Sequence, residues 1–359
     1  MTNLLPSSGS HEDTDAVGDQ ENAIELKDVA GLSQGQIVWR RFIHHKGAIV
    51  GIIVLVVIAI VAFTSVGVGP IPGWWKWNFT NTQPVQNAGH PTIGLPTWLG
   101  GSGLAWGDFP FGQDNIGRDN FARVMRGIQT SLMVMFVMGI IALVVGVVIG
   151  GLAGFYRKKT DNLLMRFTDM IITLPVIVIG AILGRLVGGG TPLLLAVALG
   201  LILWPGLARL VRGEFLSLRE REFVDAARVA GASDFRIMAK HMLPNAIGVI
   251  IVNTTLLMSA AIVLETALSF LGFGINAPDV SLGQLINEYQ SAFATRPWLF
   301  WWPGLFIIVI ALCINFIGDG LRDAFDPRQK KIPSQKQMDK AEASARQAAG
   351  RTMTGKGGI

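Results

Sequence analysis

Four ionisable residues stand within or beside long apolar runs, where a charge needs a protein partner or water. They are Asp169, Arg185, Glu265 and Asp319. A charged side chain at the centre of a bilayer costs about 2.5 to 3.5 kcal/mol on insertion scales, so such groups face a protein interior or a water-filled path. Asp169 and Asp319 fall near the predicted inner ends of their runs and Arg185 near an outer end, which favours contacts at helix ends. Glu265 lies deeper, roughly 10 Å from the outer end, and either faces a water-filled path or makes a structural hydrogen bond.

The sequence holds no recognisable catalytic constellation. It has no His-Glu-x-x-His, no Gly-x-Ser-x-Gly and no dinucleotide-binding fingerprint. The run G-R-T-M-T-G-K-G at 350–357 approximates a phosphate-binding loop, but Gly357 stands where the magnesium-binding Ser or Thr belongs, and no strand precedes it. The single cysteine, Cys313, allows no disulfide framework. We therefore expect a chain that is not an enzyme and binds no metal or cofactor, so that any chemistry comes from a partner.

Composition places the chain among polytopic all-α membrane proteins. Half of the residues (50%) are hydrophobic, 15% are charged, and the mean hydropathy is +0.46. The net charge of +5 does not indicate nucleic acid, because the basic residues form short clusters at the ends of apolar runs.

The elements that must position these residues are six predicted spans. They cover about 48–69, 131–155, 163–187, 193–210 and 246–273, with a sixth that starts near Trp298, Trp301 and Trp302 and ends near Ile317. Basic clusters alternate with these runs so that both termini are expected in the cytoplasm. Gly146, Gly150 and Gly154 in the second span have the spacing that lets helix backbones approach closely.

Three regions are expected along the chain. Residues 1–36 form a disordered acidic cytoplasmic leader without the features of a signal peptide. Residues 37–328 form the six-span domain, with an outer loop at 70–128 that opens on Trp74, Trp75 and Trp77, and an inner loop at 211–245. Residues 329–359 form a basic, disordered cytoplasmic tail that is able to lie near anionic lipid.

The inner loop contains the main polar interruption, from Glu222 to Asn245. Alanines and Phe223 at helical spacing predict a first helix, and Gly231 suits its left-handed end. Ser233 is a candidate cap for a second helix that we expect Pro244 to stop. From composition alone, the segment is either an ordinary surface hairpin or a docking element.

This segment, with Glu222, Ala226, Ala227, Gly231 and the ending Leu243-Pro244-Asn245, resembles the cytoplasmic EAA loop of binding-protein-dependent ABC importers. Three further motifs narrow the resemblance: F-P-F-G-Q-D-N-I-G-R-D at 109–119, E-T-A-L-S-F-L-G-F-G at 265–274 and N-F-I-G-D-G-L-R-D-A-F-D-P at 315–327. Together they resemble the dipeptide/oligopeptide/nickel branch, and specifically the second, C-type permease of its heterodimeric pairs.

The resemblance implies a type I ABC importer permease fold of six transmembrane helices, with an EAA coupling loop. It implies a homologous second permease, two ATP-binding subunits or domains that bind ATP and Mg, an extracytoplasmic substrate-binding protein, and a place in the bacterial plasma (inner) membrane. Peptide is the implied substrate. The residues carried over are the ATPase-coupling set Glu222, Asp225, Ala226, Ala227, Gly231 and Ser233, and the outer-loop set Gly112, Asp114, Gly117, Arg118 and Asp119.

Other functions remain open at this point. The translocation path is assigned to Glu265, Asp169 and Ser269. The alternative for the outer-loop residues is that they pin that loop onto the second span. Phe109 and Gln113 stand where the outer motif of the family usually has His and Thr, a departure that bears on the substrate and leaves the fold unchanged. Alternatives are import of nickel or another small solute and, in a different class, an ATP-independent channel or a membrane anchor.

Overall fold

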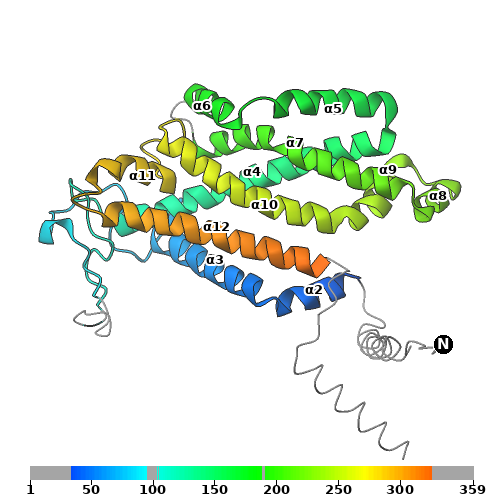
Figure 1. Cartoon of the computed structure of the whole chain (residues 1–359). Coiled ribbons are helices and arrows are strands. Elements are labelled where there is room, and N and C mark those ends of the chain that lie inside the picture. The colour runs from blue at the N-terminus through cyan, green and yellow to red at the C-terminus, as the bar shows by residue number, and fades with distance from the viewer. Residues whose placement is uncertain (1–33, 95–102, 104, 188–190, 326–359) are drawn as a thin grey trace, which may run out of the picture. The chain divides into compact units, whose positions relative to one another are not determined.

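A computed structural model describes residues 34–94, 103, 105–187 and 191–325 (Figure 1). The chain divides into two units, Met1–Arg41 with Asp326–Ile359, and Phe42–Phe325. In the first unit the described residues, 34–41, belong to helix α2 (Gln34–His44). The leader up to residue 33, the basic tail and the loop-like run at 350–357 lie outside the described residues.

The second unit is a helix bundle. Its long helices are α3 (Lys46–Ser65), α4 (Asn120–Tyr156), α5 (Lys158–Ile172), α6 (Val176–Val187), α7 (Pro192–Arg219), α10 (Leu243–Phe270) and α12 (Trp298–Phe325). Shorter elements are α8 (Glu222–Val229), α9 (Asp234–Arg236), a π-helical segment (Ile237–Met242), α11 (Leu282–Tyr289), the 3₁₀ turns η1 (Asn87–Gly89) and η4 (Gln290–Ala292), and a two-stranded antiparallel ribbon of β1 (Gly67–Val68) and β2 (Ile71–Pro72).

Among the described residues, five helices are each long and apolar enough to cross a membrane. For this count α9, the π-helical segment and α10 form one helix, Asp234–Phe270. The sixth crossing is the pair α5 and α6, which is bent by 80° at a short break. Counting this pair as one crossing gives the predicted six, although the sequence pointed to one continuous third span over 163–187. The apolar run alone does not show that the helix breaks before Pro175.

Glycines on α4 set its packing against α7. A Cβ on Gly150 would lie 2.3 Å from the Ala208 carbonyl oxygen, and one on Gly154 would lie 2.8 Å from the Arg212 carbonyl oxygen. The close approach predicted from the four-residue glycine spacing is confirmed. Because later residues of α4 meet later residues of α7, the two helices run in the same direction, and α5 with α6 must carry the chain back across the bundle.

The two ends of the bundle have separate apolar cores. At the end that carries α11, called here the α11 end, Phe121, Met125, Leu282 and Leu285 are buried together. At the opposite end, called the α8 end, Val224, Ile237 and Met242 are buried with Phe155 and Phe215. Figure 1 shows these ends at the two sides of the view.

Helix boundaries differ from the sequence predictions at α4, at α7, in the inner loop and at α12, which continues to Phe325 past the predicted end near Ile317. Helix α4 begins at Asn120 instead of near 131, because Asp119 accepts hydrogen bonds from the amides of Phe121 and Ala122 at 3.3 and 3.0 Å. Helix α7 continues to Arg219, past the predicted end near 210. The prediction that Pro244 stops the second helix of the inner loop is wrong: a π-helical segment at 237–242 leads into α10, where Pro244 occupies the first turn and needs no amide partner.

Candidate functional site

The inner-loop hairpin is built around Gly231. Helix α8 ends in a Schellman motif, in which the Gly231 amide donates to the Arg228 carbonyl and the Ala232 amide to the Ala227 carbonyl, both at 3.0 Å. Gly231 has φ +78°, and a Cβ there would meet open space. The glycine is therefore required by backbone conformation alone, as the sequence predicts, and it sets the angle at which the chain leaves α8.

The predicted coupling residues lie together on this hairpin. Glu222, Asp225 and Ala226 are exposed and Ala227 is half-buried on α8, while Ser233 is exposed after the turn. Ser233 occupies the N-cap position of α9, but its hydroxyl makes no capping hydrogen bond.

The hairpin has one anchored face and one open face. Val224 and Ile237 are wholly buried among residues of α4, α7 and α10, so the hairpin is held firmly against the bundle. On the open face Val229 is 90% exposed and Phe235 is 76% exposed. The hairpin thus presents apolar side chains that nothing among the described residues covers.

The outer-loop motif forms a compact turn at the α11 end. Gly112 and Gly117 have φ +80° and +88°, and a Cβ on Gly117 would lie 1.8 Å from the Gln83 carbonyl oxygen. Asp114 is buried and accepts the amides of Ile116 and Arg118 at 3.0 and 2.8 Å. The motif residues therefore fold the loop onto itself.

Asp119 joins the outer loop to the second span. Its carboxylate caps α4 and accepts a hydrogen bond from Trp75 Nε1 at 2.6 Å. The Gln113 side chain, buried in the same turn, accepts the Gln86 amide at 2.8 Å and donates to the Pro84 carbonyl at 3.2 Å. These contacts agree with the simpler alternative, in which the motif pins the loop onto the span.

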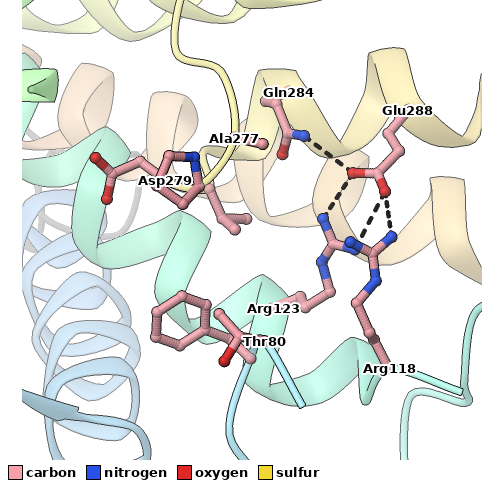
Figure 2. Close-up of a pocket in the computed structure, with 10 residues that line it drawn as sticks. Thr80, Arg118, Arg123, Ala277, Asp279, Gln284 and Glu288 are labelled. Carbon is pink, nitrogen blue, oxygen red and sulfur yellow. Dashed lines mark hydrogen bonds and ion pairs between the residues drawn. The ribbon is translucent and has the colours of Figure 1, made fainter. Parts of the chain in front are cut away.

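Two arginines connect this turn to α11. Arg123, only 2% exposed, donates to Glu288 Oε2 at 2.6 Å and to the Tyr289 hydroxyl at 2.7 Å. Arg118 pairs with Asp114 at 2.5 Å and also with Glu288. Figure 2 shows both guanidinium groups converging on the Glu288 carboxylate, which Gln284 also approaches from α11. We call Asp114, Arg118, Arg123, Glu288 and Tyr289 the α11 ionic cluster.

The cluster balances its charges. Burial by itself would raise the pKa of Glu288, but the hydrogen bonds and charges of Arg123 and Arg118 lower it below its ordinary value. Burial raises the pKa of Tyr289, so its phenol stays protonated and donates to Asp114 at 3.2 Å. Two carboxylates thus face two guanidinium groups.

A pocket of about 240 Å³ adjoins the cluster (Figure 2). It is lined by Arg118, Arg123, Asp279, Gln284 and Glu288, with Phe79 and Pro278. Arg118, Arg123 and Glu288 pair with one another, and Asp279 pairs with Arg126, so these charged groups act as structural cross-links. Among the described residues no group of His, Cys, Asp or Glu is arranged to hold a metal ion.

Three members of the α11 ionic cluster were not predicted from the sequence. Arg123, Glu288 and Tyr289 belong to no motif that we recognised, and residues 274–297 were expected to be only an outer loop. The available signal was Ser281, which caps α11 by accepting the Gln284 amide at 3.2 Å, followed by apolar residues at helical spacing.

Glu265 and Ser269 lie side by side on α10, in a buried site. The Glu265 carboxylate is wholly buried and accepts hydrogen bonds from Ser269 Oγ at 2.8 Å and from Ser131 Oγ at 3.1 Å. The same hydroxyls accept the amides of Ile275 and Leu282 at 3.1 and 3.3 Å. This geometry favours the structural alternative for Glu265, because its oxygens join α10, α4 and the chain that leads into α11.

Asp169, the third candidate for the path, lies elsewhere. It is on α5, 55% exposed, and pairs with Arg209 of α7, 50% exposed, at 2.5 Å. The structure therefore does not bring Asp169 together with Glu265 and Ser269. Of the three candidates, Asp169 alone stands on a surface.

Comparisons with known proteins agree with this architecture. Residues 146–331 match the family model of binding-protein-dependent transport system inner membrane components, and residues 33–87 match the N-terminal TM domain of oligopeptide transport permease C. The chain is 33% identical to the oligopeptide transport system permease protein OppC of Haemophilus influenzae, over 92% of this chain and 100% of that protein. It is 35% identical to OppC of Escherichia coli K12, over 86% of this chain and 96% of that protein.

A putative peptide permease protein of Brucella ovis is 36% identical over 80% of this chain and 89% of its own length. Among solved structures, an inward-facing form of the MetNI methionine ABC transporter has 22% identity and a TM-score of 0.46, covering 56% of this chain and 95% of that one. The resemblance to the dipeptide/oligopeptide/nickel branch is confirmed by the sequence matches. The chain belongs to the family of binding-protein-dependent transport system inner membrane components, as a transmembrane permease subunit of an ABC importer.

Proposed function

We propose that this chain forms half of the translocation path of an ATP-driven importer of di- or oligopeptides. A homologous permease supplies the other half, two ATP-binding subunits bind ATP and Mg and drive the cycle, and an extracytoplasmic binding protein delivers the peptide. One observation carries the proposal: over nearly its whole length the chain is similar to permeases named for oligopeptide transport.

The α8 hairpin supports the coupling role. Its anchored face, through Val224 and Ile237, links it rigidly to α4, α7 and α10, whereas its open face carries exposed Ala226, Val229 and Phe235. A rigid lever with an uncovered apolar surface suits an element that passes motion from an ATP-binding subunit to the spans.

Charge supports an orientation with the α8 end in the cytoplasm of a bacterial cell. Arginines and lysines gather at this end, next to the ends of the spans. They include Arg157, Lys158, Lys159, Arg212, Arg219, Arg221, Arg228, Arg236 and Lys240. The positive-inside rule then places the α11 end outside, where a binding protein would approach.

The test uses the complete transporter with its second permease, ATP-binding subunits and binding protein, reconstituted in liposomes. Peptides of two to eight residues, roughly the di- to oligopeptide range, should stimulate ATP hydrolysis and enter the lumen, and Ni²⁺ should do neither. If the transporter took up Ni²⁺ but no peptide, the proposed peptide cargo would be wrong. If uptake needed no ATP, the proposed ATP-driven mechanism would be wrong.

Gly231→Val tests the hairpin itself. A β-branched residue resists a φ of +78°, at a cost of about 1 to 3 kcal/mol, and turns α9 away from its position. We expect peptide-stimulated ATP hydrolysis to fall at least tenfold while the spans stay folded. Gly213→Val on α7 is the matched control, because a Cβ there also meets open space but the φ is ordinary. Equal activity of the two variants would count against coupling through this hairpin.

A further inference from the structure

The break between α5 and α6 is the one place among the described residues where a crossing of the bundle is interrupted by a sharp bend. Helix α5 ends at Ile172 and α6 begins at Val176, at 80° to it. Figure 1 shows α5 lying along α7 and α6 turning away from that direction.

The break lies near the middle of the membrane. Before it, Phe167 stacks on Trp204 of α7, with ring centroids 6.0 Å apart. After it, Gly180 packs against Leu199 of the same helix. At 1.5 Å per residue, Leu199 and Trp204 are about 10 and 18 Å along α7 from Pro192, so the break falls near the midpoint of a hydrocarbon layer of about 30 Å.

The residues at this break are largely exposed, and their backbone polar groups are only partly paired. Thr173 satisfies one carbonyl, since its hydroxyl donates to the Met170 oxygen at 2.8 Å. The first three amides of α6, on Val176, Ile177 and Val178, find no acceptor among the described residues. Thr173, Leu174 and Pro175 are all exposed. Lipid cannot satisfy such groups, so irregular backbone at this depth must line water or be buried by protein.

The pattern of exposed side chains on α5, which is independent of the break, indicates whether the break faces water or protein. Three exposed polar residues of α5 and its exposed C-cap residue follow one another at spacings of four, three and four, which places them on one face: Asn162, Arg166, Asp169 and Thr173. The neighbouring exposed stripe is apolar: Leu163, Phe167, Met170 and Leu174. The polar stripe runs from the α8 end up to the break, and its Asp169 pairs with Arg209 at the surface.

We infer that the polar stripe of α5 and the α5–α6 break form a wall of the water-filled translocation path, and that the apolar stripe beside them faces lipid or the second permease. Charged and amide groups then extend from the α8 end to mid-membrane, where the unpaired backbone amides at the start of α6 meet the water of the path. The wall accounts for the half-exposed pair Asp169–Arg209 without placing a charge in lipid. The inference rests on the proposed function in that the path forms only in the assembled transporter.

Cysteine labelling tests the wall. Cys313→Ala removes the single native thiol of this chain, and single cysteines are then introduced at Thr173 and Arg166 on the polar stripe and at Met170 and Phe167 on the apolar stripe. Each pair lies within one turn of α5, so the depth is matched. A charged, membrane-impermeant methanethiosulfonate reacts with the thiolate, which forms only in contact with water.

In the assembled transporter we expect Thr173→Cys and Arg166→Cys to be labelled at least tenfold faster than Met170→Cys and Phe167→Cys. Rates within twofold of each other in both pairs, or faster labelling of the apolar stripe, would overturn the inference. Fast labelling of the polar stripe in a complex that responds to no peptide would leave the wall in place and make the proposed cargo wrong. Slow labelling in a complex that transports peptide would overturn the wall alone.

Discussion

The α11 ionic cluster and the α8 hairpin use charged residues in opposite ways. At the α11 end, Arg123 and Asp114 are 2% and 1% exposed and belong to one network with Glu288 and Tyr289. At the α8 end, Asp225 and Arg228 pair at 2.9 Å but are 66% and 46% exposed, and they are three residues apart on one helix. The first network joins distant segments, whereas the second pair joins nothing beyond α8.

This difference separates polar residues that hold the chain together from those left for partners. A buried and satisfied network contributes specificity and rigidity, and removal of one member leaves a charge without compensation. An exposed pair on one helix contributes about 0.3 to 0.5 kcal/mol. We therefore expect substitutions in the α11 ionic cluster to act on folding and substitutions on the open face of the α8 hairpin to act on assembly.

Arg123→Met should have the largest effect. It keeps the length of the side chain but leaves Glu288 and the buried Asp114 short of a partner, and it removes a donor to Tyr289. Breaking a buried charge network in this way costs about 3 to 5 kcal/mol. Thermal unfolding of the purified complex, followed by exposure of buried cysteine to a fluorescent dye, should show a markedly lower midpoint.

Arg126→Met is the control for that substitution. Arg126 lies one turn further along α4, and its pair with Asp279, at 3.5 Å, is about one-third exposed on each side. Loss of the Arg126–Asp279 pair should lower the unfolding midpoint much less than Arg123→Met does. If the two variants unfolded at the same temperature, the α11 ionic cluster would not be the rigid element that we describe.

Asp119→Asn should have a smaller effect that depends on pH. Burial raises the pKa of Asp119 from the usual 3.8 to about 6, against the opposing hydrogen bonds of Trp75 and Ala122. The unfolded chain loses this proton at a lower pH than the folded protein. The contribution of Asp119 to the free energy of unfolding is therefore full below about pH 4, falls as the pH rises to about 6, and stays low above it.

Asn caps a helix as well as Asp but has no proton to lose. Relative to the native protein, the Asn variant should gain stability between pH 4 and pH 7, by at most about 3 kcal/mol. Unfolding midpoints at the two pH values measure this gain. Asp119→Ala, which also loses the helix cap, should be destabilised at both pH values. If the difference in unfolding midpoint between the Asn variant and the native protein did not change with pH, the role assigned to burial would be contradicted.

Local features of both ends could be predicted from the sequence. The left-handed conformation of Gly231 at the end of α8 depends on backbone geometry within a few residues, and it was confirmed. The glycine contacts of α4 depend on a fixed four-residue spacing, and they were also confirmed. The spans followed from hydropathy, because each must be apolar over about 20 residues.

Features that depend on long-range contacts could not be predicted. Arg123 and Glu288 are 165 residues apart in the chain, and nothing near either residue identifies the other as its partner. Pro244 has the usual character of a helix stop, but the π-helical turn before it removes the conflict. The break before Pro175 did have a local signal, because a proline inside a helical run ends or kinks the helix at the preceding residue, but the 80° bend depends on packing. The coupling and path assignments remain predictions, which the labelling and Gly231 experiments test.

Val229→Ser together with Phe235→Ser should have the smallest effect on folding. Both side chains are largely exposed on the open face of the hairpin, so the stability of the isolated permease should change by no more than about 0.5 kcal/mol. Binding of the ATP-binding subunits should weaken clearly if this face is their contact, because two apolar anchors are lost there. The measurement is the dissociation constant of these subunits from the permease pair in detergent, beside the unfolding midpoint of the permease alone.

Val224→Ser is the matched variant on the anchored face of the same helix. Val224 is wholly buried, so a hydroxyl in its place should destabilise the permease by about 1 to 3 kcal/mol before any partner is added. The comparison then becomes one between the anchored face and the open face of the same hairpin, where Val224 and Val229 are five residues apart on α8. If Val229→Ser with Phe235→Ser also lowered the midpoint of the isolated permease, the open face would be part of the fold, and the division between holding the chain together and meeting partners would fail at the α8 end.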